Sequence, residues 1–437
     1  MFLHYIDLGW RSLRRTPTVS FLMVLAIALG IGITMTSLSV YHMMSMDPIE
    51  QKSDRLFHPQ LQTMDDGNDT WSEDNLPFQL TYQDAQHLAQ APVGRYKAAM
   101  LRTGFTLHME NSDVRPFIQN ARATHADFFN LFDLPFIYGS AWTQEQADDA
   151  SPVVVISEAL NDKLFGGRNS VGEQFFLDDT AFRVVGVVAP FTTHMKFYDV
   201  NNGAFRDHEN LYIPFSLIAV MDIDTWGNSN GWKFENIRSM KDKRQSEIFW
   251  LQFWVQLDDD AAVKQYGEYL MGYMAEQQKS GRFNRENLQF GLRNVNDWLD
   301  YRNVVSEDNE VLVALSFMFL AVCLANILGL LLAKFMRRAP EVGVRRALGA
   351  SKRQVFLQHI VEVSMLGLIG GLLGIALAQL GLWGVRLTQE YYSPLATMDM
   401  TMLLSAPVIA IAACVIAGMY PAWLVCRTTP ATYLKTQ

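Results

Sequence analysis

Four long apolar segments alternate with polar ones along the chain. They occupy residues 18–44, 309–333, 355–385 and 400–423. Each is longer than the roughly 20 apolar residues that an α-helix needs to cross the hydrocarbon core of a bilayer. The pattern therefore predicts an α-helical membrane protein with four transmembrane helices, separated by polar segments of very different lengths.

The segment that precedes the first apolar run has the periodicity of an amphipathic helix. In residues 1–17, Phe2, Ile6 and Trp10 recur at helical spacing, and basic residues follow near the end. A helix of this kind lies in the membrane interface, with its tryptophan at the level of the lipid headgroups. Pro17 is expected to separate it from the first transmembrane helix.

The longest polar segment, residues 45–308, has the mixed pattern of an α+β domain. Residues 152–156 form a short apolar run typical of a buried strand, and residues 182–188 and 248–257 indicate further strands. Residues 261–278 are predicted to form a helix. We therefore expect a large mixed α+β domain between the first and second transmembrane helices.

The polar stretch that leads into the second transmembrane helix, residues 296–309, contains neither proline nor glycine. We therefore expect one continuous helix to run from the α+β domain into the membrane. Asn326 lies within the second apolar run. Its side chain is expected to form a hydrogen bond with a neighbouring helix.

Small residues recur in two of the apolar segments, where they allow helices to approach closely. The residues expected at helix–helix contacts are Gly30, Gly32, Gly367, Gly370, Gly371 and Gly374. Glu362 lies near one end of the third apolar segment. We expect its carboxylate to reach the membrane interface or to pair with a cation such as Arg353, a structural role rather than proton transport.

The segment between the second and third apolar runs, residues 334–354, is strongly basic. Its seven cations face a single acid, Glu341. It also predicts a short helix, because Pro340 suits a first helical position and Gly349 suits the position after a helix end. Two interpretations are open at this point: a docking surface for a partner, or a loop that only sets the topology of the membrane helices.

Charge is unevenly distributed along the chain, whose formal net charge is −9. Residues 1–17, 334–354 and 424–437 together carry twelve basic and two acidic residues, whereas residues 45–310 carry 23 basic and 40 acidic ones. Because short basic loops stay in the cytoplasm, we expect both termini and the basic segment on the cytoplasmic side. The acidic domain and a short loop at residues 386–399 are then on the other side, and nucleic acid is not expected as a partner.

The three cysteines, Cys323, Cys414 and Cys426, lie in or beside the apolar segments. The α+β domain contains none, and its scattered histidines lack the spacing of a metal site. We therefore expect no metal site and no catalytic residues in this chain. No segment matches the GxxxxGK[ST] phosphate-binding loop, so ATP hydrolysis is not expected of this chain either.

Two stretches resemble a known family. Residues 345–378 (RRALGASKRQVFLQHIVEVSMLGLIGGLLGIALA) resemble the membrane signature of FtsX-like ABC permeases. Residues 153–188, together with residues 211–215 (LYIPF), are similar to the periplasmic core domain of the MacB type. The order of one helix, a large domain and three further helices also resembles these permeases, which form the type VII or mechanotransmission class.

The resemblance implies a role for the basic segment. Its helix would be the coupling helix that docks on an ABC ATPase subunit. The residues concerned are Pro340, Glu341, Val342, Gly343, Val344, Arg345, Arg346, Leu348 and Gly349. Val342, Val344 and Leu348 would enter a groove of the ATPase, and the charged residues would surround them. Pro340 departs from the family pattern, which usually has an arginine before the glutamate.

The resemblance further implies a permease subunit of the bacterial inner membrane whose ATP and magnesium are bound by a separate ATPase chain. It would act as a homodimer or as a heterodimer with a related permease. It would drive efflux or export through a periplasmic adaptor and a TolC-like outer-membrane channel. Two alternatives share the architecture: a transmembrane regulator of a cell-wall hydrolase or a sensor, and a lipoprotein-releasing permease.

Overall fold

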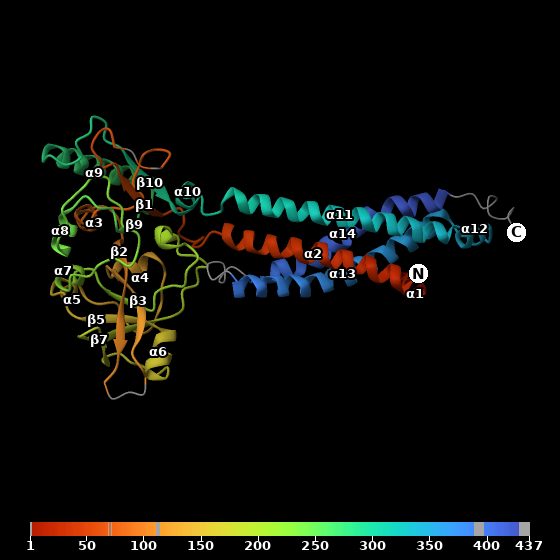
Figure 1. Cartoon of the computed structure of the whole chain (residues 1–437), viewed down its shortest axis with the longest axis horizontal. Helices are drawn as coiled ribbons and strands as arrows, with labels where there is room; N and C mark the ends of the chain where they lie inside the picture. Colours follow the sequence, from red (N-terminus) through yellow and green to blue (C-terminus); the bar gives the residue numbers. More distant parts are fainter. Residues whose placement is uncertain (1, 69, 71, 111–113, 389–396, 428–437) are drawn as a thin grey trace. The chain divides into compact units, whose positions relative to one another are not determined.

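The computed structural model of the chain describes all residues except 1, 69, 71, 111–113, 389–396 and 428–437. The chain divides into two units (Figure 1). The membrane unit comprises Met1–Met46 and Val305–Gln437, and the sheet unit comprises Asp47–Val304. The membrane unit is discontinuous in sequence because the sheet unit is inserted between its first and second long helices.

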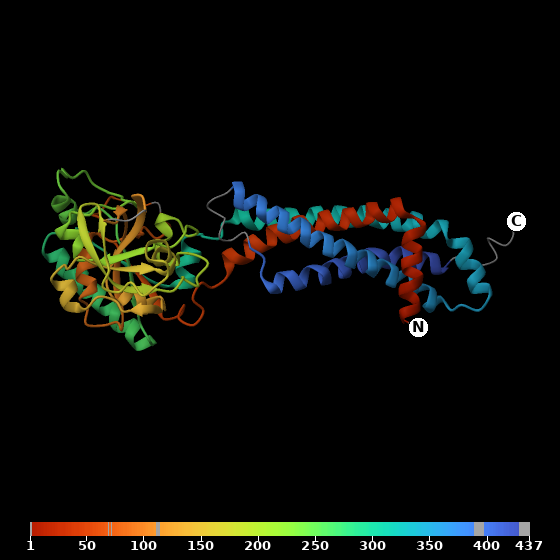
Figure 2. The same ribbon diagram turned by 90° about the horizontal axis from the view of Figure 1, so that it is seen from below.

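The membrane unit is a bundle of long helices (Figure 2). In its described part the helices are α1 Phe2–Arg15, α2 Pro17–Ser45, α11 Glu307–Arg337, α12 Ala339–Ala347, α13 Lys352–Thr388 and α14 Met400–Arg427. Of these, α2, α11, α13 and α14 are long and apolar enough to cross a membrane. They correspond to the four apolar segments of the sequence.

The glycines of α13 divide between two neighbouring helices. Gly370 and Gly374 face α2, whereas Gly367 and Gly371 face α14. A Cβ atom on Gly370 would lie 2.5 Å from the Cγ2 atom of Ile27. No side chain fits at that distance, so these glycines let the backbones of three helices approach one another.

The two glycines of α2 contact two different helices. Gly30 faces Leu320 and Cys323 of α11, and a Cβ atom there would lie 2.8 Å from the Cδ1 atom of Leu320. Gly32 faces α13, where a Cβ atom would lie 2.9 Å from the Cβ atom of Leu377. The small residues of α2 are therefore occupied by helix contacts within this chain.

The helix that enters the membrane unit is interrupted, contrary to the expectation of one continuous rod. α10 (Val295–Tyr301) ends before α11 begins at Glu307. Between them Asn303 has a φ of +46°, which a right-handed helix cannot contain. The sequence lacks proline and glycine here, but asparagine tolerates the left-handed region better than other side chains.

Asn326 also differs from its prediction. It lies on the exposed side of α11. Among the described residues it forms no hydrogen bond with a neighbouring helix. Asn326 directly precedes the buried Ile327, and adjacent residues of a helix lie about 100° apart around its axis, so the two side chains do not share one face.

The sheet unit contains a mixed ten-stranded sheet in the order β10-β1-β9-β2-β3-β8-β5-β7-β4, with β6 paired to both β2 and β7. The strands are β1 Leu56–Leu61, β2 Lys97–His108, β3 Phe117–Thr124, β4 Phe136–Gly139, β5 Val153–Ser157, β6 Gln174–Leu177, β7 Thr180–Val188, β8 Leu211–Pro214, β9 Gln252–Gln256 and β10 Phe290–Asn294. The pairs β3–β8 and β5–β7 are parallel. This is the mixed α+β domain expected from the sequence.

Short helices and one long helix accompany the sheet. They are α3 Tyr82–Ala89, α4 Asp127–Leu131, α5 Gln144–Asp148, α6 Glu158–Phe165, α7 Leu217–Val220, α8 Met240–Gln245 and α9 Asp260–Lys279, with the 3₁₀ helix η1 Phe197–Asn202. The sequence placed α9 well. It overestimated β9, because Phe249 and Leu251 form only isolated bridges before that strand begins.

A fully buried charge network lies beside β3. The Arg122 side chain is 0% exposed and forms ion pairs with Asp199 at 2.7 Å and with Glu209 at 2.9 Å. Lys196 reaches Glu209 at 2.8 Å. Burial alone would raise the pKa of Glu209, but the charges of Arg122 and Lys196 hold it well below its usual range.

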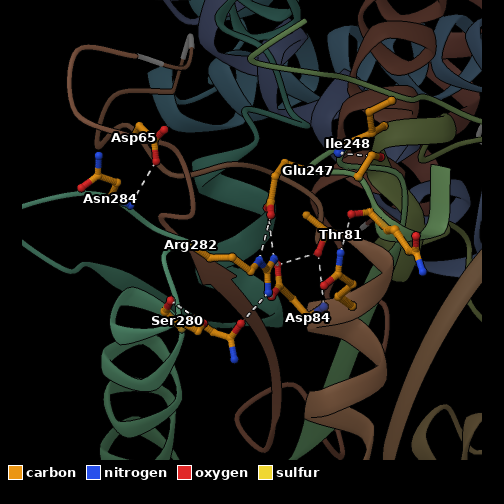
Figure 3. Close-up of polar contacts among 12 residues, drawn as sticks. Asp65, Thr81, Asp84, Glu247, Ile248, Ser280, Arg282 and Asn284 are labelled. Carbon is orange, nitrogen blue, oxygen red and sulfur yellow. Dashed lines mark hydrogen bonds and ion pairs between the residues drawn. The ribbon is translucent and has the colours of Figure 1, made fainter. Parts of the chain in front are cut away.

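A second network joins α3 to the loop after α9 (Figure 3). Arg282 forms ion pairs with Asp84 at 3.0 Å and with Glu247 at 2.8 Å. Asp84 also accepts hydrogen bonds of 2.6 Å from the hydroxyl groups of Thr81 and Tyr273. The Asp84 side chain is 0% exposed, so these donors replace the water that the carboxylate loses on folding.

Candidate functional site

The residues of α12 explain where this short helix begins and ends. Pro340 occupies the first turn, where its missing N–H leaves no hydrogen bond unmade. Glu341 lies near the positive end of the helix dipole, and Arg345 and Arg346 lie in the last turn near the negative end. Gly349 follows with a φ of +105°, a backbone conformation that favours glycine.

One face of α12 is buried and the other is exposed. Val342 is only 6% exposed and packs among the apolar side chains of the long helices. Val344 and Leu348 are 50% and 83% exposed. The structure thus corrects the expectation that Val342 enters a partner's groove. Residues two apart lie on nearly opposite sides of a helix, so Val342 and Val344 cannot share one surface.

Two arginines of α12 hold the helix to the bundle. Arg345 forms an ion pair of 2.7 Å with Glu341 and donates a hydrogen bond of 3.4 Å to Gln358 of α13. Arg346 donates a hydrogen bond of 3.1 Å to the carbonyl oxygen of Cys426 in α14. The two side chains therefore make internal contacts, rather than only surrounding the docking residues as expected.

A buried ion pair joins α11 to α13 near this end of the bundle. The Nζ atom of Lys334 lies 2.6 Å from Oε1 of Glu362, and the two side chains are 1% and 2% exposed. The expected partner of Glu362, Arg353, is exposed. α11 extends to Arg337, one turn beyond the apolar segment, and this extension carries Lys334 into the bundle.

The same carboxylate attaches α1 to the bundle. The hydroxyl group of Ser12 donates a hydrogen bond to Glu362, and Arg338 donates one to Ser12. Arg338 also reaches the carbonyl oxygen of Ser12 at 3.2 Å. Gly9 allows this approach, because a Cβ atom there would lie 2.9 Å from the Sδ atom of Met365. α1, α11, α12 and α13 thus meet at one polar cluster.

Ser12 and Lys334 were missed as site residues by the sequence analysis. Ser12 lies on an amphipathic helix where a serine carries no special signal, and Lys334 was counted with the basic loop. A carboxylate within an apolar segment indicated that a cationic partner must exist. Its identity required the fold, because the two residues lie on different helices.

Two other predicted features fall partly outside the described residues. The tail predicted to be cytosolic, residues 424–437, begins as the end of α14, and its residues 428–437 lie outside. Residues 389–396 of the short loop do as well. Within the part of the chain that the structure describes, no group of three or more His, Cys, Asp or Glu side chains could hold a metal ion.

Comparison with known protein families matches both units. Residues 20–271 match the MacB-like periplasmic core domain, and residues 313–430 match the FtsX-like permease C-terminal domain. Among solved structures, the periplasmic region of MacB from Actinobacillus actinomycetemcomitans covers 60% of this chain and 97% of its own, at 16% identity and a TM-score of 0.37.

Curated relatives are distant in sequence. The macrolide export ATP-binding/permease protein MacB of Syntrophobacter fumaroxidans is 21% identical over 342 residues, which are 71% of this chain and 46% of that protein. The pyoverdine export ATP-binding/permease protein PvdT of Pseudomonas aeruginosa is 23% identical over 325 residues, 72% of this chain and 42% of that protein. The chain therefore spans less than half the length of these two relatives.

A third relative is matched over most of its length. The uncharacterized ABC transporter permease YvrN of Bacillus subtilis is 21% identical over 372 residues, which are 82% of this chain and 81% of that protein. The two family matches together cover most of the sheet unit and most of the long helices on both sides of it. The chain therefore belongs to the family of ABC transporter permeases that combine a MacB-like periplasmic core domain with an FtsX-like permease domain.

Proposed function

We propose that this chain is a permease subunit driven by a separate ABC ATPase polypeptide, which docks on α12. The observation that carries the proposal is the combination of a firmly held helix with an exposed apolar tip. Leu348 is 83% exposed at the end of a helix that Arg345 and Arg346 tie to α13 and α14. An exposed apolar side chain on a well-anchored element is what a partner's groove requires.

The orientation of the chain in the inner membrane belongs to the same proposal. The helix α1, which carries Arg11, Arg14 and Arg15, lies at the same end of the membrane unit as α12 (Figure 2), and Arg11 and Arg15 line a cavity with Arg338 and Arg345. Short basic segments are retained in the cytoplasm during insertion. That end is then cytoplasmic, and the sheet unit is periplasmic.

The polar cluster gives α12 a route to the long helices. Arg338, at the start of α12, contacts Ser12 of α1, and Ser12 contacts Glu362 of α13, which pairs with Lys334 of α11. A displacement of α12 by a docked ATPase would therefore move these helices together. The glycines of α13 bring this helix into direct contact with α2 and α14, so a movement of α13 would also reach these two helices.

We favour export as the process that this movement drives. The relatives named MacB and PvdT are export proteins for macrolides and pyoverdine. By analogy the chain would work as a homodimer, or as a heterodimer with a related permease, beside a periplasmic adaptor and a TolC-like channel. ATP and magnesium would be bound by the ATPase. Regulation of a cell-wall hydrolase or a sensor, and release of lipoproteins, remain the alternatives that the experiment below separates.

The experiment is gentle purification of the full chain, with mass spectrometry of the proteins that co-purify. We expect an ABC ATPase, and an adaptor if the function is export. A hydrolase, a sensor kinase or lipoproteins in place of the adaptor would support the corresponding alternative.

The matched variants are Leu348→Asp and Leu348→Met. The first places a charge on the exposed tip of α12, and we expect it to weaken ATPase binding at least about tenfold, since one buried leucine contributes about 1.5–3 kcal/mol. The second keeps the tip apolar and should retain the ATPase. Equal retention by both variants would contradict docking on α12.

A further inference from the structure

A polar cavity of about 110 Å³ lies at the end of the membrane unit, between α1, α12 and the start of α13. Four arginines line it, Arg11 and Arg15 from α1 and Arg338 and Arg345 from the α12 region. Its volume has room for several water molecules, and therefore for one phosphate group.

The charges around the cavity do not balance. Arg11 pairs with Asp7 at 2.8 Å, and Arg345 pairs with Glu341. The carboxylate of Glu362, which also lines the cavity, is already neutralised by Lys334. The remaining two arginines, Arg15 and Arg338, have no carboxylate partner among the residues that the structure describes.

Two guanidinium groups without acids favour a particular ligand. Guanidinium presents a planar fork of N–H donors that matches phosphate oxygens, and the charge-assisted hydrogen bonds that result are the strong ones. Arg15 comes from α1 and Arg338 from the junction of α11 and α12. A phosphate between them would therefore join the first helix of the chain to α12.

The position of the cavity indicates the source of the phosphate. Arg15 lies two residues before the first membrane-crossing helix begins, and Arg338 directly follows the second. Such positions lie at the level of the lipid headgroups. On α1 the Trp10 ring is 43% exposed and carries the Arg14 guanidinium 5.1 Å from its centroid, as suits a helix in the membrane interface.

We propose that this cavity binds the phosphate group of an anionic phospholipid. Basic pockets between membrane helices are the kind of site that recognises anionic headgroups. The bound headgroup bridges α1 and α12, so the lipid becomes part of the connection between α12 and the bundle. The proposal rests on the proposed function only for the leaflet that supplies the lipid, which is the cytoplasmic one.

The test uses the full chain without an ATPase, in nanodiscs of phosphatidylcholine with a minority of phosphatidylglycerol. The chain is then released from the nanodiscs, and native mass spectrometry counts the lipid molecules that each chain retains. We expect the wild type to retain phosphatidylglycerol in preference to phosphatidylcholine. Arg15→Gln should lower this retention about tenfold, as the loss of a charge-assisted contact does.

Arg14→Gln is the matched control. It removes the same charge from the neighbouring position, which stacks on Trp10 and does not line the cavity. It should retain phosphatidylglycerol as the wild type does, and gel filtration should show both variants folded. Equal retention by Arg14→Gln and Arg15→Gln would overturn the proposal.

Competition with inorganic phosphate tests whether the cavity binds a soluble phosphate ion instead of a lipid headgroup. We expect phosphate to leave the retained phosphatidylglycerol in place, because it cannot share the membrane contacts of the lipid chains. Displacement of the lipid by phosphate would overturn the lipid assignment in favour of a soluble phosphate ligand. Since no ATPase is present, failure of this test leaves docking on α12 untouched, and the Leu348 variants test that separately.

Discussion

The sheet unit and the membrane unit pack their interiors with side chains of opposite size. The sheet unit fills its core with large rings, among them Trp250, Trp254 and Trp298, which are each at most 2% exposed. The membrane unit instead presses Ile27 and Ile31 of α2 against the bare glycine backbone of α13. Burying rings is favourable in water, whereas lipid offers helices no such gain and close van der Waals contact must hold them together.

The two units also differ in where they bury charge. Arg122 lies inside the sheet unit, with Asp199, Glu209 and Lys196 around it. In the membrane unit the buried pair of Lys334 and Glu362 lies at the end that carries α12. The first network joins β3 to η1 and to the segment before β8. The second connects the helices next to the proposed docking surface.

The largest loss of stability is expected from breaking the buried charge network of the sheet unit. Arg122→Ala leaves the carboxylates of Asp199 and Glu209 without their main cation, which costs about 3–5 kcal/mol for a buried pair. Tryptophan fluorescence during urea unfolding of the full chain measures it. Arg168→Ala, which removes an exposed partner of Glu173, should cost less than about 1 kcal/mol. Similar losses for the two variants would show that burial is not what matters.

A smaller effect is expected from filling a glycine contact. Gly370→Leu forces α13 away from Ile27, and overpacking of this kind costs about 1–3 kcal/mol. Gly384→Leu lies on the same helix where nothing is within 4 Å of a Cβ atom, so it should be tolerated. Thermal unfolding in detergent compares the stability of the two variants. If Gly384→Leu destabilised the chain as much, close helix contact could not be the cause.

The third effect is gradual, a pH dependence of the free energy of unfolding that comes from the sheet unit. Burial lowers the pKa of His58 to about 3, below its value of 6.5 in the unfolded chain. The unfolded state therefore binds the proton first, and stability is full above pH 6.5 and falls as the pH drops towards 3. We expect His58 to contribute a loss of about 1.4 kcal/mol per pH unit between pH 6 and 4. His58→Gln should flatten this slope; an unchanged slope would assign it to other groups.

The sequence predicted the elements of both units because their patterns are local. The apolar segments gave the four long helices, and the short apolar run at residues 152–156 gave β5. Helix ends were also readable where a residue has one strong preference, as at Pro340 and Gly349. The interruption at Asn303 was not readable, because asparagine permits a left-handed conformation without requiring it.

The site was predicted only in outline, because its contacts join residues far apart in the chain. The helix and its charges were found, but the burial of Val342 depends on how α12 packs against the long helices. The pairing of Lys334 with Glu362, and their link to Ser12, depends on three helices meeting. Such contacts between distant residues cannot be predicted from one sequence.

The central claim is that an ATPase subunit docks on the exposed tip of α12, and site-specific cross-linking tests it most directly. The native cysteines Cys323, Cys414 and Cys426 are all buried, so a new surface cysteine reacts selectively. Leu348→Cys should form a cross-link to the ATPase in membranes, whereas Leu404→Cys, 65% exposed on α14, should not. An ATPase adduct at position 404 without one at position 348 would contradict the account.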